Sequence, residues 1–70
     1  MPNHYFNLSG KKIRQLRDKY KISQETLACE IDMTRGIIIK IEADRYKQIT
    51  LCTCYKIAKY FNVSIESLIE

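Results

Sequence analysis

Apolar residues recur along this chain mostly at intervals of three and four, which is the spacing of one face of an α-helix. The first such set is Ile13, Leu16 and Tyr20. Ser9 precedes this set and can cap a helix over residues 10–20. Ser23 can cap a second helix of about eight residues, and Asp32 ends it because Asp tolerates the left-handed conformation better than most residues.

Residues 34–44 read TRGIIIKIEAD, and three consecutive isoleucines after a glycine at first favour a short buried strand. The spacing decides for a helix, because Ile38 and Ile41 lie three apart on one face. Thr34 can cap this third helix. Gly36 costs about 1 kcal/mol relative to alanine inside a helix, so tertiary packing must supply the stability.

Two more segments follow a polar loop at residues 44–48. Thr50 can cap a fourth helix and Asn62 can end it. The apolar face of that helix would consist of Leu51, Cys54, Ile57, Ala58 and Phe61. Ser64 can cap a last helix. That last helix would carry Ile65, Leu68 and Ile69.

The pattern therefore predicts a compact all-α domain of five short helices over residues 10–70, preceded by an N-terminal tail over residues 1–9. No segment reads as a strand. Tyr5 and Phe6 in the tail belong either to a mobile arm or to a cover over one edge of the core. With only 70 residues, one small domain of modest stability is expected, without a large enzyme-type pocket.

Charge adds a bias towards an anionic partner. Twelve Lys and Arg against eight Asp and Glu give a net charge of +4 and a pI of about 9.1. Six of the basic residues fall between positions 11 and 21, namely Lys11, Lys12, Arg14, Arg17, Lys19 and Lys21. Such a run is typical of a nucleic-acid-binding surface or, equally, of a solvated helix face.

Other kinds of chemistry find little support in the sequence. The three cysteines, Cys29, Cys52 and Cys54, are an odd number without C-x-x-C spacing, and His4 is the sole histidine. We interpret the three cysteines as reduced thiols of a cytoplasmic protein, and we expect no metal site and no cofactor. No membrane segment, small-molecule substrate site or catalytic arrangement is indicated, so we do not expect an enzyme.

The window QETLACEIDMTRGIIIKIEA, residues 24–43, resembles the helix-turn-helix of the lambda repressor and Cro family, also called the XRE family. Ala28 stands where the two helices cross, Asp32 stands in the turn, and Ile38 and Ile41 stand at buried positions. The flanking segments IRQLRDKYKISQETLA and KIAKYFNVSIESLI are similar to the family's first helix and to its fourth and fifth. The resemblance covers nearly the whole chain and implies a lambda-repressor-like DNA-binding domain.

In this family the second helix of the motif lies in the major groove of double-stranded DNA. The resemblance places base contacts at Arg35, Gly36 and Lys40, and Ile37, which flanks the exposed face, is a further candidate. Arg and Lys suit the acceptors of guanine, and an isoleucine can contact the thymine methyl group. For Ile37 and the neighbouring Ile39, the alternative is a partly covered flank that packs on neighbouring loops.

The resemblance also implies a DNA-phosphate contact at Gln24. Further candidates for phosphate contacts are Thr34 and, in the loop after the recognition helix, Arg45 and Lys47. Arg17 and Glu42 occupy positions that the family commonly fills with a structural ion pair. A carboxylate beside the buried face of the third helix needs such a partner.

Several residues depart from the family pattern. Lys21 and Asp32 stand where the family usually has glycine, and Ala43-Asp44 replaces the common Asn-Gly after the recognition helix. Ile49 stands where proline is frequent. These departures affect the turn geometry and the ends of the helices.

We therefore expect a sequence-specific transcriptional regulator, in particular a repressor. It would bind two half-sites as a homodimer through its C-terminal region, around Tyr60, Ile65 and Ile69. The alternative is a protein-binding module, such as an antitoxin or anti-repressor partner with the same fold. Its exposed apolar patch would consist of Ile37, Ile39, Tyr46 and Ile49.

Overall fold

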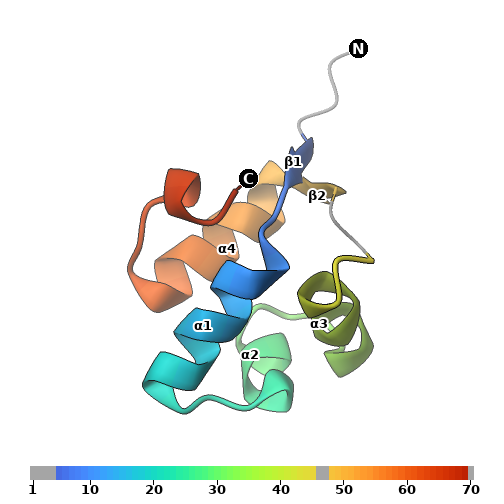
Figure 1. The fold of residues 1–70 in the computed structure, drawn as a ribbon, viewed down its shortest axis with the longest axis vertical. Coiled ribbons are helices and arrows are strands. Elements are labelled where there is room, and N and C mark those ends of the chain that lie inside the picture. The colour runs from blue at the N-terminus through green and yellow to red at the C-terminus, as the bar shows by residue number, and fades with distance from the viewer. Residues whose placement is uncertain (1–4, 46–47, 70) are drawn as a thin grey trace.

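Four α-helices surround one apolar core in the computed structural model, which describes residues 5–45 and 48–69 (Figure 1). The helices are α1 (Gly10–Tyr20), α2 (Gln24–Glu30), α3 (Arg35–Glu42) and α4 (Leu51–Phe61). The last predicted helix is instead a single 3-10 turn, η1 (Ile65–Ser67). The all-α class is thus confirmed, whereas the expected count of five α-helices is wrong.

Each helix begins at a hydroxyl side chain, as the sequence predicts. Every cap accepts a hydrogen bond from the backbone N–H three residues further on, which satisfies a donor that the helix leaves free. The caps are Ser9, Ser23, Thr34, Thr50 and Ser64.

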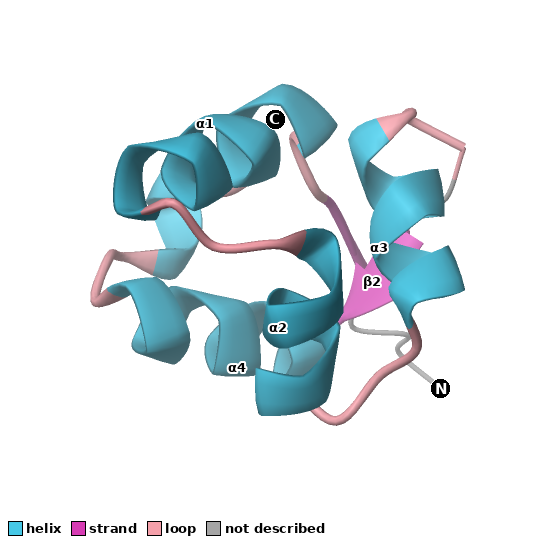
Figure 2. Cartoon of the chain, turned by 90° about the horizontal axis from the view of Figure 1, so that it is seen from below, coloured by secondary structure: helices cyan, strands magenta, loops and turns pink. Residues whose placement is uncertain are grey.

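The core forms where the apolar faces of the four helices meet. Ile38 and Ile41 are fully buried in it, so the helical interpretation of the isoleucine run is correct. Figure 2 shows α2 and α3 side by side, with α1 and α4 towards the other side. Two residues that were assigned to apolar faces, Tyr20 and Leu51, lie at the surface instead.

A short antiparallel sheet was not expected from the sequence. Strand β1 (Tyr5–Asn7) pairs with β2 (Gln48–Thr50), with Phe6 opposite Ile49. Leu8 continues the pairing through an isolated bridge to Ile69. The N-terminal tail is therefore partly ordered as a strand, and the predicted loop after α3 ends in a strand at Gln48.

Four residues adopt the left-handed backbone conformation at the ends of the helices. They are Lys21, Asp32, Asp44 and Asn62, with φ between 55° and 60°. Lys21 and Asp32 are the two positions where the resembled family usually has glycine. The chain keeps the turns that glycine would favour, although a side chain in this conformation costs about 1–2 kcal/mol.

Gly10 permits a close approach between α1 and α3. A Cβ atom at this position would overlap the carbonyl oxygen of Ile41 and would lie 3.0 Å from the Cα of Glu42. Helix α1 therefore begins directly against the backbone of α3, which fixes the position of α3 in the molecule.

Candidate nucleic-acid interface

The outer face of α3 is accessible and carries two cationic side chains. Arg35, Gly36 and Lys40 are exposed on it, while Ile38 and Ile41 on the opposite face hold the helix to the core. The helix lies at one side of the molecule, with one face free along its length (Figure 2). Because the anchoring residues and the exposed residues alternate at helical spacing, α3 can present its cations without loss of packing.

The two isoleucines that flank this face differ in exposure. Ile37 is partly buried and packs against the core, whereas the side chain of Ile39 is 43% exposed. Of the two, Ile39 thus has the larger apolar surface available for a contact.

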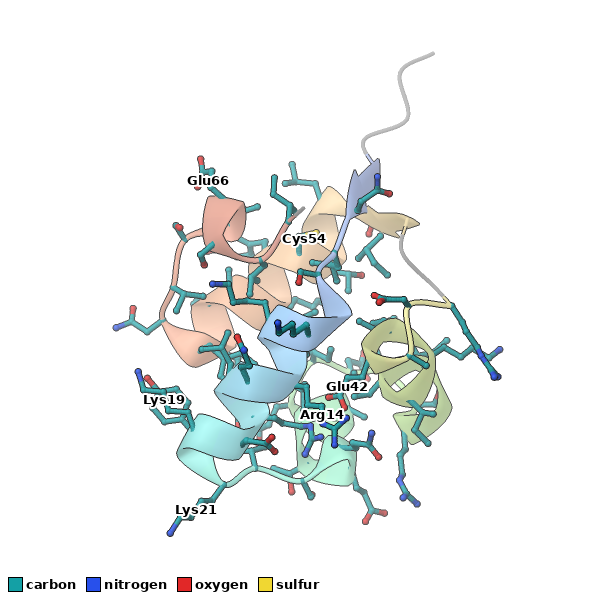
Figure 3. All side chains as sticks on the ribbon, in the orientation of Figure 1. Arg14, Lys19, Lys21, Glu42, Cys54 and Glu66 are labelled. Carbon is teal, nitrogen blue, oxygen red and sulfur yellow. The ribbon has the colours of Figure 1, made fainter. Side chains whose placement is uncertain are left out.

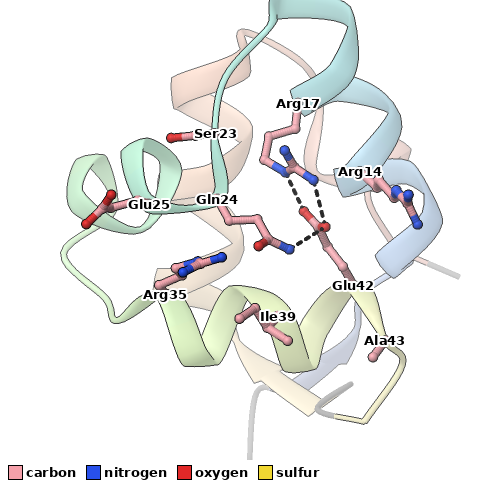
Figure 4. A pocket seen from close by; sticks show the side chains of 9 residues that line it. All are labelled: Arg14, Arg17, Ser23, Gln24, Glu25, Arg35, Ile39, Glu42 and Ala43. Carbon is pink, nitrogen blue, oxygen red and sulfur yellow. Dashed lines mark hydrogen bonds and ion pairs between the residues drawn. The ribbon is translucent and has the colours of Figure 1, made fainter.

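An ion pair joins α1 to α3 behind this face (Figure 4). Arg17 Nε donates to Glu42 Oε2 at 2.7 Å, and Arg17 Nη2 donates to Glu42 Oε1 at 2.9 Å. The side chains of Arg17 and Glu42 are only 14% and 7% exposed. Such a two-point contact between a guanidinium and a carboxylate fixes both position and angle.

Two further hydrogen bonds extend this pair into a network. Arg17 Nη1 donates to the carbonyl oxygen of Ile22 at 3.0 Å, which ties down the connection between α1 and α2. Gln24 Nε2 donates to Glu42 Oε1 at 3.1 Å. The carboxylate of Glu42 therefore holds side chains from both α1 and α2, and it raises the pKa of Arg17 through hydrogen bonding against the opposing effect of burial.

A cleft of about 670 Å³ lies between α1, the start of α2 and α3 (Figure 4). The guanidinium-bearing residues that line it are Arg14, Arg17 and Arg35. The sequence placed Arg14 within the basic run but could not indicate that it lies beside α3 (Figure 3). Glu25 and Glu42 line it as well, and Glu42 neutralises Arg17, so the cleft carries a small excess of positive charge next to the exposed face of α3.

The residues expected at phosphates lie around α3, with one exception. Gln24 is half-buried at the start of α2, Thr34 caps α3 with its hydroxyl exposed, and Arg45 is exposed directly after α3. Lys47 lies outside the described residues. The structure thus brings Gln24 and Arg35 to the lining of the same cleft, while Thr34 directly precedes Arg35 at the start of α3.

The apolar patch expected for a protein-binding module does not form as predicted. Ile49 is only 2% exposed, because β2 carries it into the core. Ile37 is also partly covered, and Tyr46 lies outside the described residues. Ile39 is then the remaining member with a large exposed surface.

The C-terminal residues expected at a dimer surface, Tyr60, Ile65 and Ile69, are all partly buried against the core. Tyr60 lies in a separate groove with Tyr20, on the side of the molecule away from α3. Ile65 begins the turn η1 after α4, and Ile69 forms the isolated bridge with Leu8, directly after β1.

Other potential sites are few in the described part of the chain. Cys29 and Cys52 are exposed, Cys54 is buried, and burial raises the pKa of the Cys54 thiol. No group of three His, Cys, Asp or Glu residues is placed to hold a metal ion among residues 5–45 and 48–69. Within the same residues, no helix combines the length and the apolar character needed to cross a membrane.

The chain is similar in sequence to a known protein family and to individual regulators. A family model described as a helix-turn-helix domain matches residues 10–70. The chain is 40% identical over 57 residues to an uncharacterised HTH-type transcriptional regulator of Archaeoglobus fulgidus, a match that covers 81% of this chain and 80% of that protein.

Two solved structures are similar in fold. The restriction-modification controller protein C.AhdI from Aeromonas hydrophila matches with a TM-score of 0.77 and 27% identity, over 86% of this chain and 89% of that one. SinR, the master regulator for biofilm formation, solved in complex with DNA, matches with a TM-score of 0.76 over 81% of this chain and 90% of that one. Its identity of 21% supports the shared fold alone.

Proposed function

The chain belongs to the helix-turn-helix domain family, and we propose that it is a sequence-specific transcriptional regulator that binds double-stranded DNA through α3. The observation that carries this proposal is the exposed face of α3, where Arg35 and Lys40 lie opposite the buried Ile38 and Ile41. A helix fits the major groove, which is roughly 12 Å wide and displays a distinct pattern for each base pair. Docking by α3 would bring its N-terminal residues to the base edges.

The proposed base contacts are Arg35, Gly36, Ile37 and Lys40. Arg35 can donate two hydrogen bonds to guanine, and Lys40 can donate one. Gly36 lets the backbone approach the base pairs closely, since it adds no side chain. Ile37 can offer only its uncovered part to a thymine methyl group, and the more exposed Ile39 can add to that contact.

Phosphate contacts would fix the register of α3 without reading the sequence. We assign them to Gln24, Thr34, Arg45 and Lys47. The hydrogen bond from Gln24 Nε2 to Glu42 supports this role, because it orients the amide while leaving its oxygen and second N–H group for other partners. Arg14 can add to the positive potential from the cleft beside α3.

We further propose a repressor that binds as a homodimer to two half-sites about one helical turn apart. The C-terminal region around Ile65 and Ile69 is the surface that we assign to the dimer. Sedimentation of the free protein and of the DNA complex tests this assignment: a monomer in both states would contradict it.

In-vitro selection from random duplex DNA tests the main proposal. We expect one sequence to be enriched, with affinity that falls steeply as salt rises because bound phosphates release their counterions. Arg35→Ala and Lys40→Ala should each cost about 1–3 kcal/mol and relax the preference at one base position. Lys56→Ala on α4 is the control and should leave the preference unchanged. Absence of any enriched sequence would refute the proposal, whereas enrichment unaffected by both α3 variants would refute only the assigned base contacts.

A further inference from the structure

The C-terminal ends of α1 and α4 lie on the side of the molecule away from α3 (Figures 1 and 2). A second hollow lies between these two helix ends. Its volume is about 320 Å³. We call it the aromatic groove, and its lining residues are Tyr20, Ile22, Tyr60, Phe61 and Asn62. None of these residues has a part in the DNA contacts assigned above.

The floor of the aromatic groove is a preformed cluster of rings. Tyr20 stacks on Phe61 with ring centroids 6.1 Å apart, and Tyr60 meets Phe61 edge to face at 5.2 Å. Phe61 is buried and anchors the cluster, while Tyr20 is 49% exposed. Rings held in this way offer apolar surface at little entropic cost on binding.

The surroundings of the aromatic groove are basic. Lys19 and Lys21 flank Tyr20 and are exposed, and both lie at the free end of α1 (Figure 3). Lys56 precedes Tyr60 by four residues on α4, which places it one turn away on the same face. The lining contains no acidic residue. Asn62, at the end of α4, adds an amide that can both donate and accept hydrogen bonds.

We propose that the aromatic groove binds an acidic segment of a partner protein, with one bulky apolar side chain on the rings and flanking carboxylates on the lysines. The lysines around the aromatic groove favour an acidic partner, because carboxylates complement their charge. A second copy of the chain would bring an equally basic surface against this one, with a net charge of +4 on each copy.

Nucleic acid fits the aromatic groove less well than an acidic peptide. A duplex has no apolar side group to fill the hollow. A single strand binds along a basic groove that follows its backbone over about 4–16 nucleotides, whereas the aromatic groove is a local hollow of about 320 Å³ with the Lys19 ammonium 5.4 Å from the Tyr20 ring centroid. Because the groove lies away from α3, the partner could bind while α3 is engaged, and the proposal does not depend on the DNA contacts.

A tryptophan-labelled peptide provides a direct test, because the chain itself contains no tryptophan. The probe is a short synthetic peptide with a Leu-Trp pair between two pairs of aspartates, and its control carries lysine in place of each aspartate. We expect the fluorescence of the acidic peptide to titrate with the full chain, and binding to weaken several-fold between about 50 and 300 mM salt. The lysine peptide should not bind.

The chain offers a matched pair of variants for this test. Tyr55 on α4 resembles Tyr20 in exposure (54%) and also carries a lysine ammonium, that of Lys59, 5.8 Å from its ring centroid. We expect Tyr20→Ala to weaken binding of the acidic peptide by about five-fold or more. Tyr55→Ala should leave it unchanged. If Tyr20→Ala does not fold, the double variant Lys19→Glu and Lys21→Glu provides the test, because both residues are exposed. This variant should abolish binding of the acidic peptide.

Other outcomes would overturn the proposal. Equal binding of the lysine peptide would show apolar capture without charge selection. Equal losses in the two tyrosine variants would place the contact elsewhere. Displacement of the peptide by an oligothymidine strand, or dimerisation that Tyr20→Ala abolishes, would assign the groove to a nucleic acid or to a second copy.

Discussion

Replacement of Arg17 by methionine should destabilise the domain strongly. The side chain of Glu42 is only 7% exposed. Without Arg17, its carboxylate would keep only the hydrogen bond from Gln24 among the side-chain contacts of this network. A buried charge left without its counter-ion typically costs about 3–5 kcal/mol. A domain of 70 residues has a total stability of about 4–10 kcal/mol. The single variant should therefore lose between about a third and all of its stability.

The double variant Arg17→Met and Glu42→Leu separates the stranded charge from the loss of the contact itself. Apolar side chains of similar volume often replace a buried ion pair without loss, so the double variant should recover to within about 1–2 kcal/mol of the native chain. Urea denaturation of the three proteins measures these differences. A loss below about 1 kcal/mol in Arg17→Met would mean that solvent screens the pair, as it screens surface pairs. A double variant no more stable than the single one would also refute the reasoning.

Three smaller perturbations test other features by denaturation. Lys21→Gly relieves a left-handed residue and should change stability by between 0 and about +1 kcal/mol, whereas Lys19→Gly inside α1 should lose about 1 kcal/mol. Because burial raises the pKa of Cys54, the unfolded chain releases this proton first. Stability should thus fall as pH rises above about 8.5, and Cys54→Ala should reduce that slope. Gly10→Ala should lower the free energy of unfolding by about 1–3 kcal/mol, because the new Cβ atom would overlap the α3 backbone. Gly36→Ala should raise it by up to about 1 kcal/mol, because the atom nearest to the new Cβ is 3.8 Å away. If Gly36→Ala were the more destabilising of the two, the packing described would be wrong.

Local patterns in the sequence predicted the helices well, because their signals lie within a few residues. The caps and the buried pair Ile38 and Ile41 depend only on helical spacing and on hydroxyl chemistry. The sheet was missed because strands of three residues are too short to show alternation, and Phe6 pairs with Ile49 across most of the chain.

The sequence predicted the exposed residues of α3 better than it predicted the contacts around them. Arg35 and Lys40 follow from the position of α3, but the hydrogen bond between Gln24 and Glu42 depends on how α2 and α3 pack. The aromatic groove likewise depends on the meeting of two helix ends that are far apart in sequence. Tyr20 was assigned to an apolar face, and helical spacing alone could not show that its ring would remain half exposed.

The shared carboxylate of Glu42 has a consequence for how related chains can vary. It joins Arg17, which holds α1, to Gln24, which we assign to a phosphate contact. A change at position 42 would disturb the fold and the placement of that contact at once, so no substitution at this position can alter one without the other. Among descendants of a common ancestor, positions 17, 24 and 42 should therefore change together, as a correlated triplet rather than as three independent sites.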